Sequence, residues 1–305
     1  MKFDAYQMVT DRICELLEQG LKPWAQPWSS AVSCAWSGND GRVYTLLNQM
    51  LLADPAKKYH TMSDLLEDIR GEWVTYNQAQ ARGGQVRKGE KGRKVVFFKM
   101  MDKPTGKFDA DGNEKHETIP FLNVYTVFKV SQCDGIEQKY HLNDDKLFDF
   151  TADDSAEKVA NEYLTREGIS YEKVKGDRAF YRPSEDKIVT PLPEQFEDRG
   201  EYYSTLFHEM THSTGHEKRL NRLTKCAAFG NEDYSTEELV AEIGSASLMA
   251  TLGIGSDSNL KMSAAYIKSW LKALKNDKRM IVVASGRAEK AVKMILNIKE
   301  ENVNA

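Results

Sequence analysis

Cysteine is scarce in this 305-residue chain. The four cysteines, Cys14, Cys34, Cys133 and Cys226, lie far apart and form no Cys-x-x-Cys pair. This spacing argues against a zinc ribbon and against a fold held together by disulfide bonds. Isolated thiols of this kind fit a reducing compartment, so we expect a cytoplasmic protein.

Long apolar stretches are also missing. No run approaches the roughly 18 apolar residues that a transmembrane helix needs, and residues 1–6 lack the charged-then-apolar pattern of a signal peptide. We therefore expect no membrane partner and no secretion. The hydrophobic content of 41% and charged content of 29% predict a folded protein of two domains or one large domain.

Histidine is rare, with six residues, yet two of them fall in the short motif His208-Glu209-Met210-Thr211-His212. On a helix, two histidines four positions apart project from one face. Such a pair can hold Zn²⁺ while Glu209 stands beside the open position as a general base. The alternative is an ordinary helix whose histidines cap it or pair with carboxylates. Because histidine is scarce, the metal interpretation is favoured.

A third ligand is expected from a second helix that starts near Ser235 or Thr236. Glu238 and Glu242 share one face of that helix. We predict that Glu238 binds the metal and that Glu242 orients a ligating histidine through its far nitrogen. Glu237 remains an alternative ligand, and a solvated acidic face remains the alternative for one of the three.

His216 is a further candidate ligand just after the motif. Gly215 is expected to end the helix before it. We therefore predict that His216 supports the site or lies on the surface, without binding the metal itself.

The second informative stretch, 82–99, holds seven basic residues and one acidic residue, with glycines between them. Cations suit phosphates, glycines allow close approach of the backbone, and nearby aromatic rings can stack on unpaired bases. This pattern favours single-stranded DNA over a duplex, for which no helix-turn-helix is apparent. The alternative is a solvated, lysine-rich hairpin. The candidate basic residues are Arg87, Lys88, Lys91, Arg93 and Lys94, and the candidate aromatic residues are Trp73, Tyr76, Phe97 and Phe98.

Composition also suggests how the chain is divided. A strand is predicted at 95–99 and another at 121–130, with the polar, glycine-rich stretch 102–118 as a loop between them. Residues 136–154 are polar and acidic, which predicts a linker between a domain at 1–135 and a second at 155–305.

Two short strands at 179–182 and 186–190 are predicted to precede the histidine motif. An edge strand there could bind a substrate peptide by strand addition. The expected fold class is α+β, with helices and antiparallel strands in the first domain and a mostly helical second domain with a small sheet.

Several motifs in sequence order resemble the ArdC family of antirestriction proteins, which are encoded on conjugative plasmids and other mobile elements. The motifs of the first part are Lys22-Pro23-Trp24…Pro27-Trp28, Arg42-x-Tyr44…Asn48, Trp73-x-Thr75-Tyr76-x-Gln78-Ala79, Gly84-Gln85-Val86-Arg87-Lys88-Gly89-Glu90-Lys91-Gly92 and Tyr125-x-Val127-Phe128…Gln132-Cys133-x-Gly135. Those of the second part are Tyr203-x-Thr205-Leu206-x-His208-Glu209-x-x-His212-x-x-Gly215-His216…Arg219-Leu220 and Tyr234…Glu237-Glu238-Leu239-x-Ala241-Glu242.

The resemblance implies a single-stranded-DNA-binding domain joined to a zincin-like metallopeptidase domain. It implies that His208 and His212 bind metal, that Glu209 is the catalytic carboxylate and that a downstream glutamate completes the site. Zn²⁺ is the expected ion, with Mn²⁺ or another divalent ion as alternatives. Arg42, Trp73 and Tyr76 join the basic residues as expected DNA contacts.

The expected function is antirestriction, with single-stranded DNA and an unidentified protein, such as a host restriction enzyme, as partners. In this interpretation the metal domain hydrolyses proteins bound to the same DNA. One alternative is a protein that only coats DNA and whose metal site is structural or vestigial. Another is a DNA-dependent protease that acts on DNA–protein crosslinks.

Overall fold

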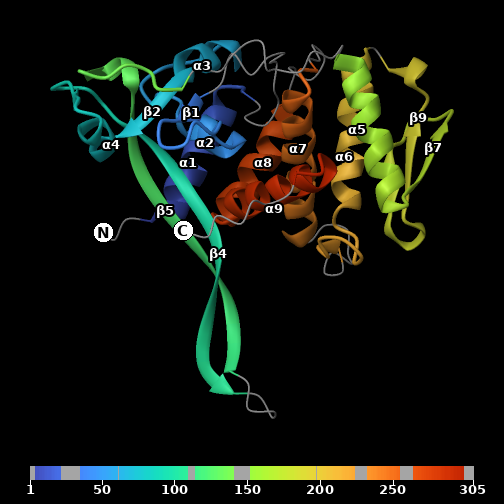
Figure 1. The fold of residues 1–305 in the computed structure, drawn as a ribbon. Coiled ribbons are helices and arrows are strands. Elements are labelled where there is room, and N and C mark those ends of the chain that lie inside the picture. Colours follow the sequence, from blue (N-terminus) through green and yellow to red (C-terminus); the bar gives the residue numbers. More distant parts are fainter. Residues whose placement is uncertain are drawn as a thin grey trace.

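The computed structural model describes residues 4–21, 35–60, 62–108, 114–140, 152–196, 198–223, 232–254 and 264–298. Its fold is α+β, as predicted (Figure 1). The tryptophan-containing segment 22–34 and most of the expected linker lie outside these residues. Among the helices described, none is long and apolar enough to cross a membrane.

The first part of the chain is built on a four-stranded sheet in the order β1-β2-β5-β4. Strand β1 (Ala35–Ser37) runs parallel to β2 (Gly71–Thr75), and the other pairs are antiparallel. The helices are α1 (Ala5–Glu18), α2 (Leu46–Leu51), α3 (Met62–Ile69) and α4 (Tyr76–Ala81). A separate small ladder joins β3 (Gln85–Val86) to β6 (Cys133–Asp134), and a 3-10 turn, η2 (Val130–Gln132), precedes β6.

The two longest strands form an arm that projects from the body of the molecule (Figure 1). They are β4 (Arg93–Phe108) and β5 (Glu114–Lys129), each of 16 residues. The prediction of a loop over 102–118 is therefore wrong, because only 109–113 separates the two strands. A two-stranded ribbon has no core beneath its outer half, so the sequence there lacks the apolar alternation that marks a half-buried strand.

The second part begins with α5 (Ala152–Glu167) and a three-stranded sheet in the order β7-β9-β8. Strand β9 (Lys187–Pro191) is central, between β7 (Ser170–Val174) and β8 (Phe180–Arg182). The sequence predicts only β8 and β9 and places β9, the strand before the histidine motif, at the edge of the sheet. The structure adds β7, which pairs with β9, so that β9 is central and the edge strands are β7 and β8. The remaining elements are η4 (Pro183–Glu185), η5 (Pro193–Gln195), α6 (Arg199–Ser213), α7 (Glu232–Thr251), α8 (Ala264–Asn276) and α9 (Met280–Ile295).

Helices α7 and α9 pack into two hydrophobic clusters at once. Leu239 and Ile243 of α7 belong to the cluster of α1, α2 and the sheet, whereas Leu248 belongs to the cluster of α5 and α6. Gly286 of α9 lies so close to the arm that a Cβ there would stand 3.1 Å from the ring of Phe98. The two parts of the chain share this packing, and the boundaries 1–135 and 155–305 stay a prediction.

Candidate metal centre and nucleic-acid surface

The motif lies on α6, whose first turn is capped by Asp198. The Asp198 carboxylate accepts a hydrogen bond from the backbone N–H of Glu201 at 2.7 Å. Leu206, Phe207 and Met210 are buried in the hydrophobic cluster beneath the helix. The helical period turns His208 and His212 to another face, toward α7.

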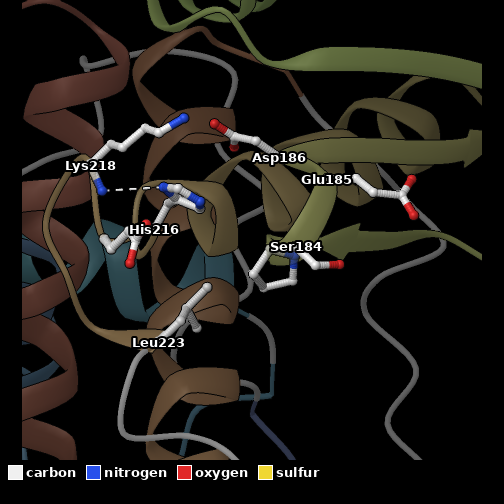
Figure 2. Close-up of a pocket in the computed structure, with 8 residues that line it drawn as sticks. Ser184, Glu185, Asp186, His216, Lys218 and Leu223 are labelled. Carbon is white, nitrogen blue, oxygen red and sulfur yellow. Dashed lines mark hydrogen bonds between the residues drawn. The ribbon is translucent and has the colours of Figure 1, made fainter.

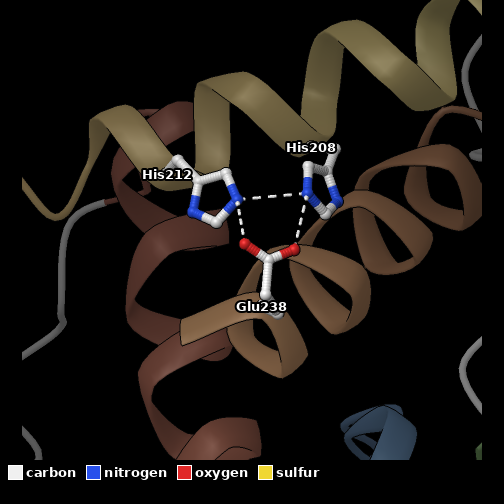
Figure 3. A group of neighbouring side chains, drawn as sticks. All are labelled: His208, His212 and Glu238. Carbon is white, nitrogen blue, oxygen red and sulfur yellow. Dashed lines mark hydrogen bonds and ion pairs between the residues drawn. The ribbon is translucent and has the colours of Figure 1, made fainter. Parts of the chain in front are cut away.

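Glu238 of α7 meets both histidines (Figure 3). The two Nε2 atoms lie 3.1 Å apart. One carboxylate oxygen of Glu238 is 3.6 Å from Nε2 of His208, and the other is 3.5 Å from Nε2 of His212. Within the described part of the chain, these three side chains form the one group whose donor atoms converge as metal ligands would.

The donor set fits a divalent metal. A tetrahedral Zn²⁺ with bonds of roughly 2.0–2.2 Å holds its ligand atoms about 3.3 Å apart, close to the separations of 3.1, 3.5 and 3.6 Å. Two imidazoles and one carboxylate leave a fourth position for water or substrate, as catalytic zinc sites require. The His208 and Glu238 side chains are 24% and 30% exposed, so solvent reaches this group of donors.

A glycine brings the two helices this close. A Cβ at Gly244 of α7 would lie 2.5 Å from Cγ2 and 2.7 Å from Oγ1 of Thr211 on α6. Thr211 is itself fixed by a hydrogen bond from its hydroxyl to the carbonyl of Phe207 at 2.7 Å. The absence of a side chain at Gly244 therefore sets the approach that carries Glu238 to the histidines.

Glu237 lies at the far nitrogen of His212, with 3.5 Å between its Oε1 and Nδ1. It is held from behind by Arg222, whose Nη2 and Nε donate to the two carboxylate oxygens at 2.8 and 3.0 Å. The carboxylate that orients His212 is thus Glu237, where the sequence had favoured Glu242. Glu237 and Glu238 are adjacent on α7, so their side chains differ in direction by the rotation of one residue. The angle at which α6 and α7 cross therefore decides which glutamate lies at Nδ1 of His212 and which at Nε2.

The carboxylates around His212 affect its pKa more strongly than its burial does. Burial alone would lower the pKa of His212, but the hydrogen bond with Glu237 and the charges of Glu209 and Glu238 raise it above its ordinary value. Glu209 itself is buried and lies near enough to contribute to that effect. A cation bound at Nε2 would be favoured by the same carboxylates.

His216 lines a cavity of about 460 Å³ (Figure 2) and is not one of the three converging donors. Its Nδ1 accepts a hydrogen bond from the backbone N–H of Lys218 at 3.2 Å. Asp186, from the turn between β8 and β9, lines the same cavity and is paired with the buried Arg219. Arg219 also donates to the carbonyl of Ser213 at 2.7 Å, so this pair ties the small sheet to the end of α6.

Two tyrosines that precede the motif do not reach toward the metal group. The hydroxyl of Tyr202 is hydrogen-bonded to that of Tyr171 at 2.9 Å, and Tyr203 donates to Glu157 at 3.3 Å. Both rings belong to the hydrophobic cluster. Their hydroxyls are thus used in packing the domain.

Two of the expected DNA contacts are turned inward. Trp73 is 1% exposed and donates its Nε1–H to the carbonyl of Ile69 at 2.7 Å, so its ring has no free face for a base. The guanidinium of Arg93 packs over that ring and pairs with Asp68 at 2.6 Å. Both predictions are corrected, because alternation along β2 and β4 directs these side chains into the core.

The other expected contacts lie at the surface. Arg87 pairs with Glu90 at 2.9 Å, and the amine of Lys94 donates to Thr126 at 2.6 Å. Arg42, Tyr76, Lys88 and Lys91 are also exposed. The side chains of Lys88 and Lys91 form no ion pair with the residues that the structure describes. This set can present positive charge to a phosphate backbone.

Both the first and the second part of the chain match known protein families. Residues 3–128 match the family model for the N-terminal domain of anti-restriction factor ArdC, and residues 158–287 match that for a zincin-like metallopeptidase. The metal-free crystal structure of antirestriction protein ArdC from plasmid R388 is 36% identical, with a TM-score of 0.66 over 96% of this chain and 97% of that one. Its Mn(II)-bound structure is 35% identical, with a TM-score of 0.69 over 97% and 98%.

Two Escherichia coli proteins named DNA primase TraC are also similar. Each is 35% identical over 98% of this chain, which spans only 20% and 27% of their lengths.

The fold and the matched domains define a zincin-like domain joined to an ArdC-type N-terminal domain. The chain belongs to the ArdC family of antirestriction proteins.

Proposed function

We propose that this protein binds single-stranded DNA with its N-terminal part and carries a metal-dependent peptidase centre that acts on proteins bound to that DNA. The observation that carries the proposal is the convergence of His208, His212 and Glu238, with the buried Glu209 on the same helix. Joining the two activities raises the effective concentration of the peptidase near proteins on the same strand.

His208, His212 and Glu238 would hold the ion. Zn²⁺ suits two nitrogens and one oxygen, and Mn²⁺ is an alternative because the related ArdC was crystallised with Mn(II). A bound divalent ion would acidify water and polarise a peptide carbonyl. Glu209 would accept a proton and deliver it to the leaving amine. Glu237, held by Arg222, would keep His212 in the ligating orientation.

The N-terminal match to an antirestriction domain and the exposed cations Lys88 and Lys91 support the DNA partner. Two relatives are named DNA primases, which supports an association with DNA. Cys14 and Cys133 are buried free thiols, which suits action in a reducing cytosol.

The proposal is tested by incubating the zinc-loaded protein with a restriction enzyme in the absence and in the presence of single-stranded DNA. We expect cleavage by the wild type that increases when DNA is added. The matched control is Glu209→Gln, which should retain zinc, measured by mass spectrometry of the metal, and lose cleavage. Full cleavage by this variant would refute the peptidase role. Full antirestriction without cleavage would favour a protein that protects DNA by coating it.

A further inference from the structure

The arm carries most of the exposed aromatic side chains of the described chain. Among the described residues, the exposed large hydrophobic side chains on the arm are Phe97, Phe108, Phe121 and Tyr125, and those elsewhere are Val43, Tyr76 and Ile298. Three of the rings, Phe97, Phe121 and Tyr125, are 39–51% exposed and lie close together on the part of the arm nearest the body.

The strand register places these three rings in a regular row. Tyr125 stands opposite Val95, Phe97 opposite Asn123, and Phe121 opposite Lys99. Residues directly opposite each other point to the same face of a sheet, as do residues two apart on one strand. The face therefore presents one ring at each of three successive levels, about 7 Å apart.

The opposite face of the same segment is occupied by packing. Phe98, Leu122 and Val124 are partly buried against the hydrophobic cluster of the first part. Gly286 of α9 meets the ring of Phe98 so closely that a Cβ would stand 3.1 Å away. On the face of the row, Val95 is covered at the body end, but the three rings are exposed to solvent.

The surroundings of the row are polar and basic. The Asn123 amide donates to the hydroxyl of Tyr125 at 3.4 Å. Lys88 and Lys91, which precede β4, are exposed on the side from which the row begins. The buried core of a protein interface is enriched in apolar side chains, whereas here each ring stands opposite a residue that is not aromatic. Separate rings flanked by cations suit a chain of bases and phosphates.

We propose that Tyr125, Phe97 and Phe121 form a stacking row for three successive unpaired bases, with the phosphates toward Lys88 and Lys91; this rests on the single-stranded-DNA binding proposed above. The spacing of about 7 Å is twice the 3.4 Å rise per base of a stacked strand. Each ring therefore receives one base of an extended strand. A duplex, whose base faces are already covered, is not bound by the row.

The test compares two full-length proteins, each with two oligonucleotides. Fluorescence anisotropy measures the affinity of wild type and of Phe97→Ala/Phe121→Ala/Tyr125→Ala for oligothymidine and for an abasic oligonucleotide of the same length. Stacking on an aromatic side chain contributes about tenfold per base. We expect the triple variant to bind oligothymidine at least a hundredfold more weakly, with the salt slope unchanged and abasic binding unchanged.

Matched variants separate stacking from damage to the fold. Phe97→Tyr/Tyr125→Phe keeps all the rings and should bind as the wild type does. Phe108→Ala removes a ring outside the row that is even more exposed, at 64%, and should also leave affinity unchanged. Lys88→Glu/Lys91→Glu should weaken binding to both oligonucleotides and reduce the salt slope.

The contrary outcomes are distinct. Equal affinity of wild type and triple variant for oligothymidine would overturn the stacking row and leave single-stranded-DNA binding standing. An equal loss for the abasic strand, or a change of oligomeric state in light scattering, would assign the rings to folding or self-association and overturn it as well. No binding of either oligonucleotide by the wild type would overturn both this inference and the proposed DNA partner.

Discussion

Replacing Arg222 with methionine removes the cation behind the residue that orients His212. The Arg222 and Glu237 side chains are 6% and 4% exposed, and two hydrogen bonds of 2.8 and 3.0 Å join them. Arg222 also donates to the hydroxyl of Thr214 at 2.8 Å and to the carbonyl of Thr211 at 2.9 Å. Arg222→Met would therefore leave a buried carboxylate without its main partner.

The expected cost follows from that burial. Removing one partner of a buried ion pair lowers the free energy of unfolding by about 3–5 kcal/mol, whereas replacing both partners is close to neutral. We expect a loss of about 3 kcal/mol for Arg222→Met and recovery of most of it in Arg222→Met/Glu237→Gln, which carries no buried charge at this position. Because residues that hold a ligand in place contribute roughly 10- to 100-fold to metal affinity, zinc binding should weaken by about that factor in the single variant.

Urea unfolding followed by circular dichroism measures the stability, and competition with a chromophoric chelator measures zinc affinity. The reasoning would be refuted by an Arg222→Met protein within about 1 kcal/mol of wild type that binds zinc equally well. A double variant no more stable than the single one would show that the uncompensated charge of Glu237 is not the cause of the loss.

Three further predictions test the packing around the site and the first part of the fold. Gly244→Ala should push α7 away from Thr211 and weaken zinc binding more than Ala246→Gly on the same helix, as chelator competition would reveal; equal zinc affinity would mean that the close approach is unimportant. Asp68 is partly buried, which would raise its pKa, but hydrogen bonds from Arg93, Lys57 and Tyr59 outweigh this effect and lower the pKa to about 2. Its contribution of about 2 kcal/mol is thus present above pH 4 and lost as pH falls toward 2, so wild type should lose more stability than Asp68→Asn across that window, and parallel curves would contradict this. Asn48 pairs its amide with both the N–H and the carbonyl of Val96, at 2.7 and 2.9 Å, so Asn48→Ala should lower the free energy of unfolding by about 2 kcal/mol in urea titrations, and an unchanged midpoint would argue against that pairing.

The histidine motif is readable from sequence because its geometry is local. The helical period alone puts His208 and His212 on one face, and their scarcity in the chain makes the pattern specific. The way α7 crosses α6 at Gly244 determines that Glu238 joins the metal ligands and that Glu237 orients His212. No spacing rule contains that crossing, so the orienting glutamate and Arg222 behind it could not be predicted.

The DNA-facing side chains were harder to assign for a different reason. Trp73 and Tyr76 are neighbours in sequence, yet one lies in the core and the other at the surface, because β2 ends and α4 begins between them. The predicted strand at 121–130 already contains Phe121 and Tyr125, and strand alternation places both on one face. The register that brings Phe97 of β4 to the level between them depends on how the two strands pair, which the sequence pattern does not fix.

The most direct test of the metal centre is anomalous diffraction at the zinc edge from crystals grown with Zn²⁺. The arrangement predicts one strong peak about 2 Å from Nε2 of His208, Nε2 of His212 and a carboxylate oxygen of Glu238, and its loss in Glu238→Ala crystals. A peak coordinated by Glu237 or His216, or none near α6 at full zinc occupancy of the protein, would contradict it.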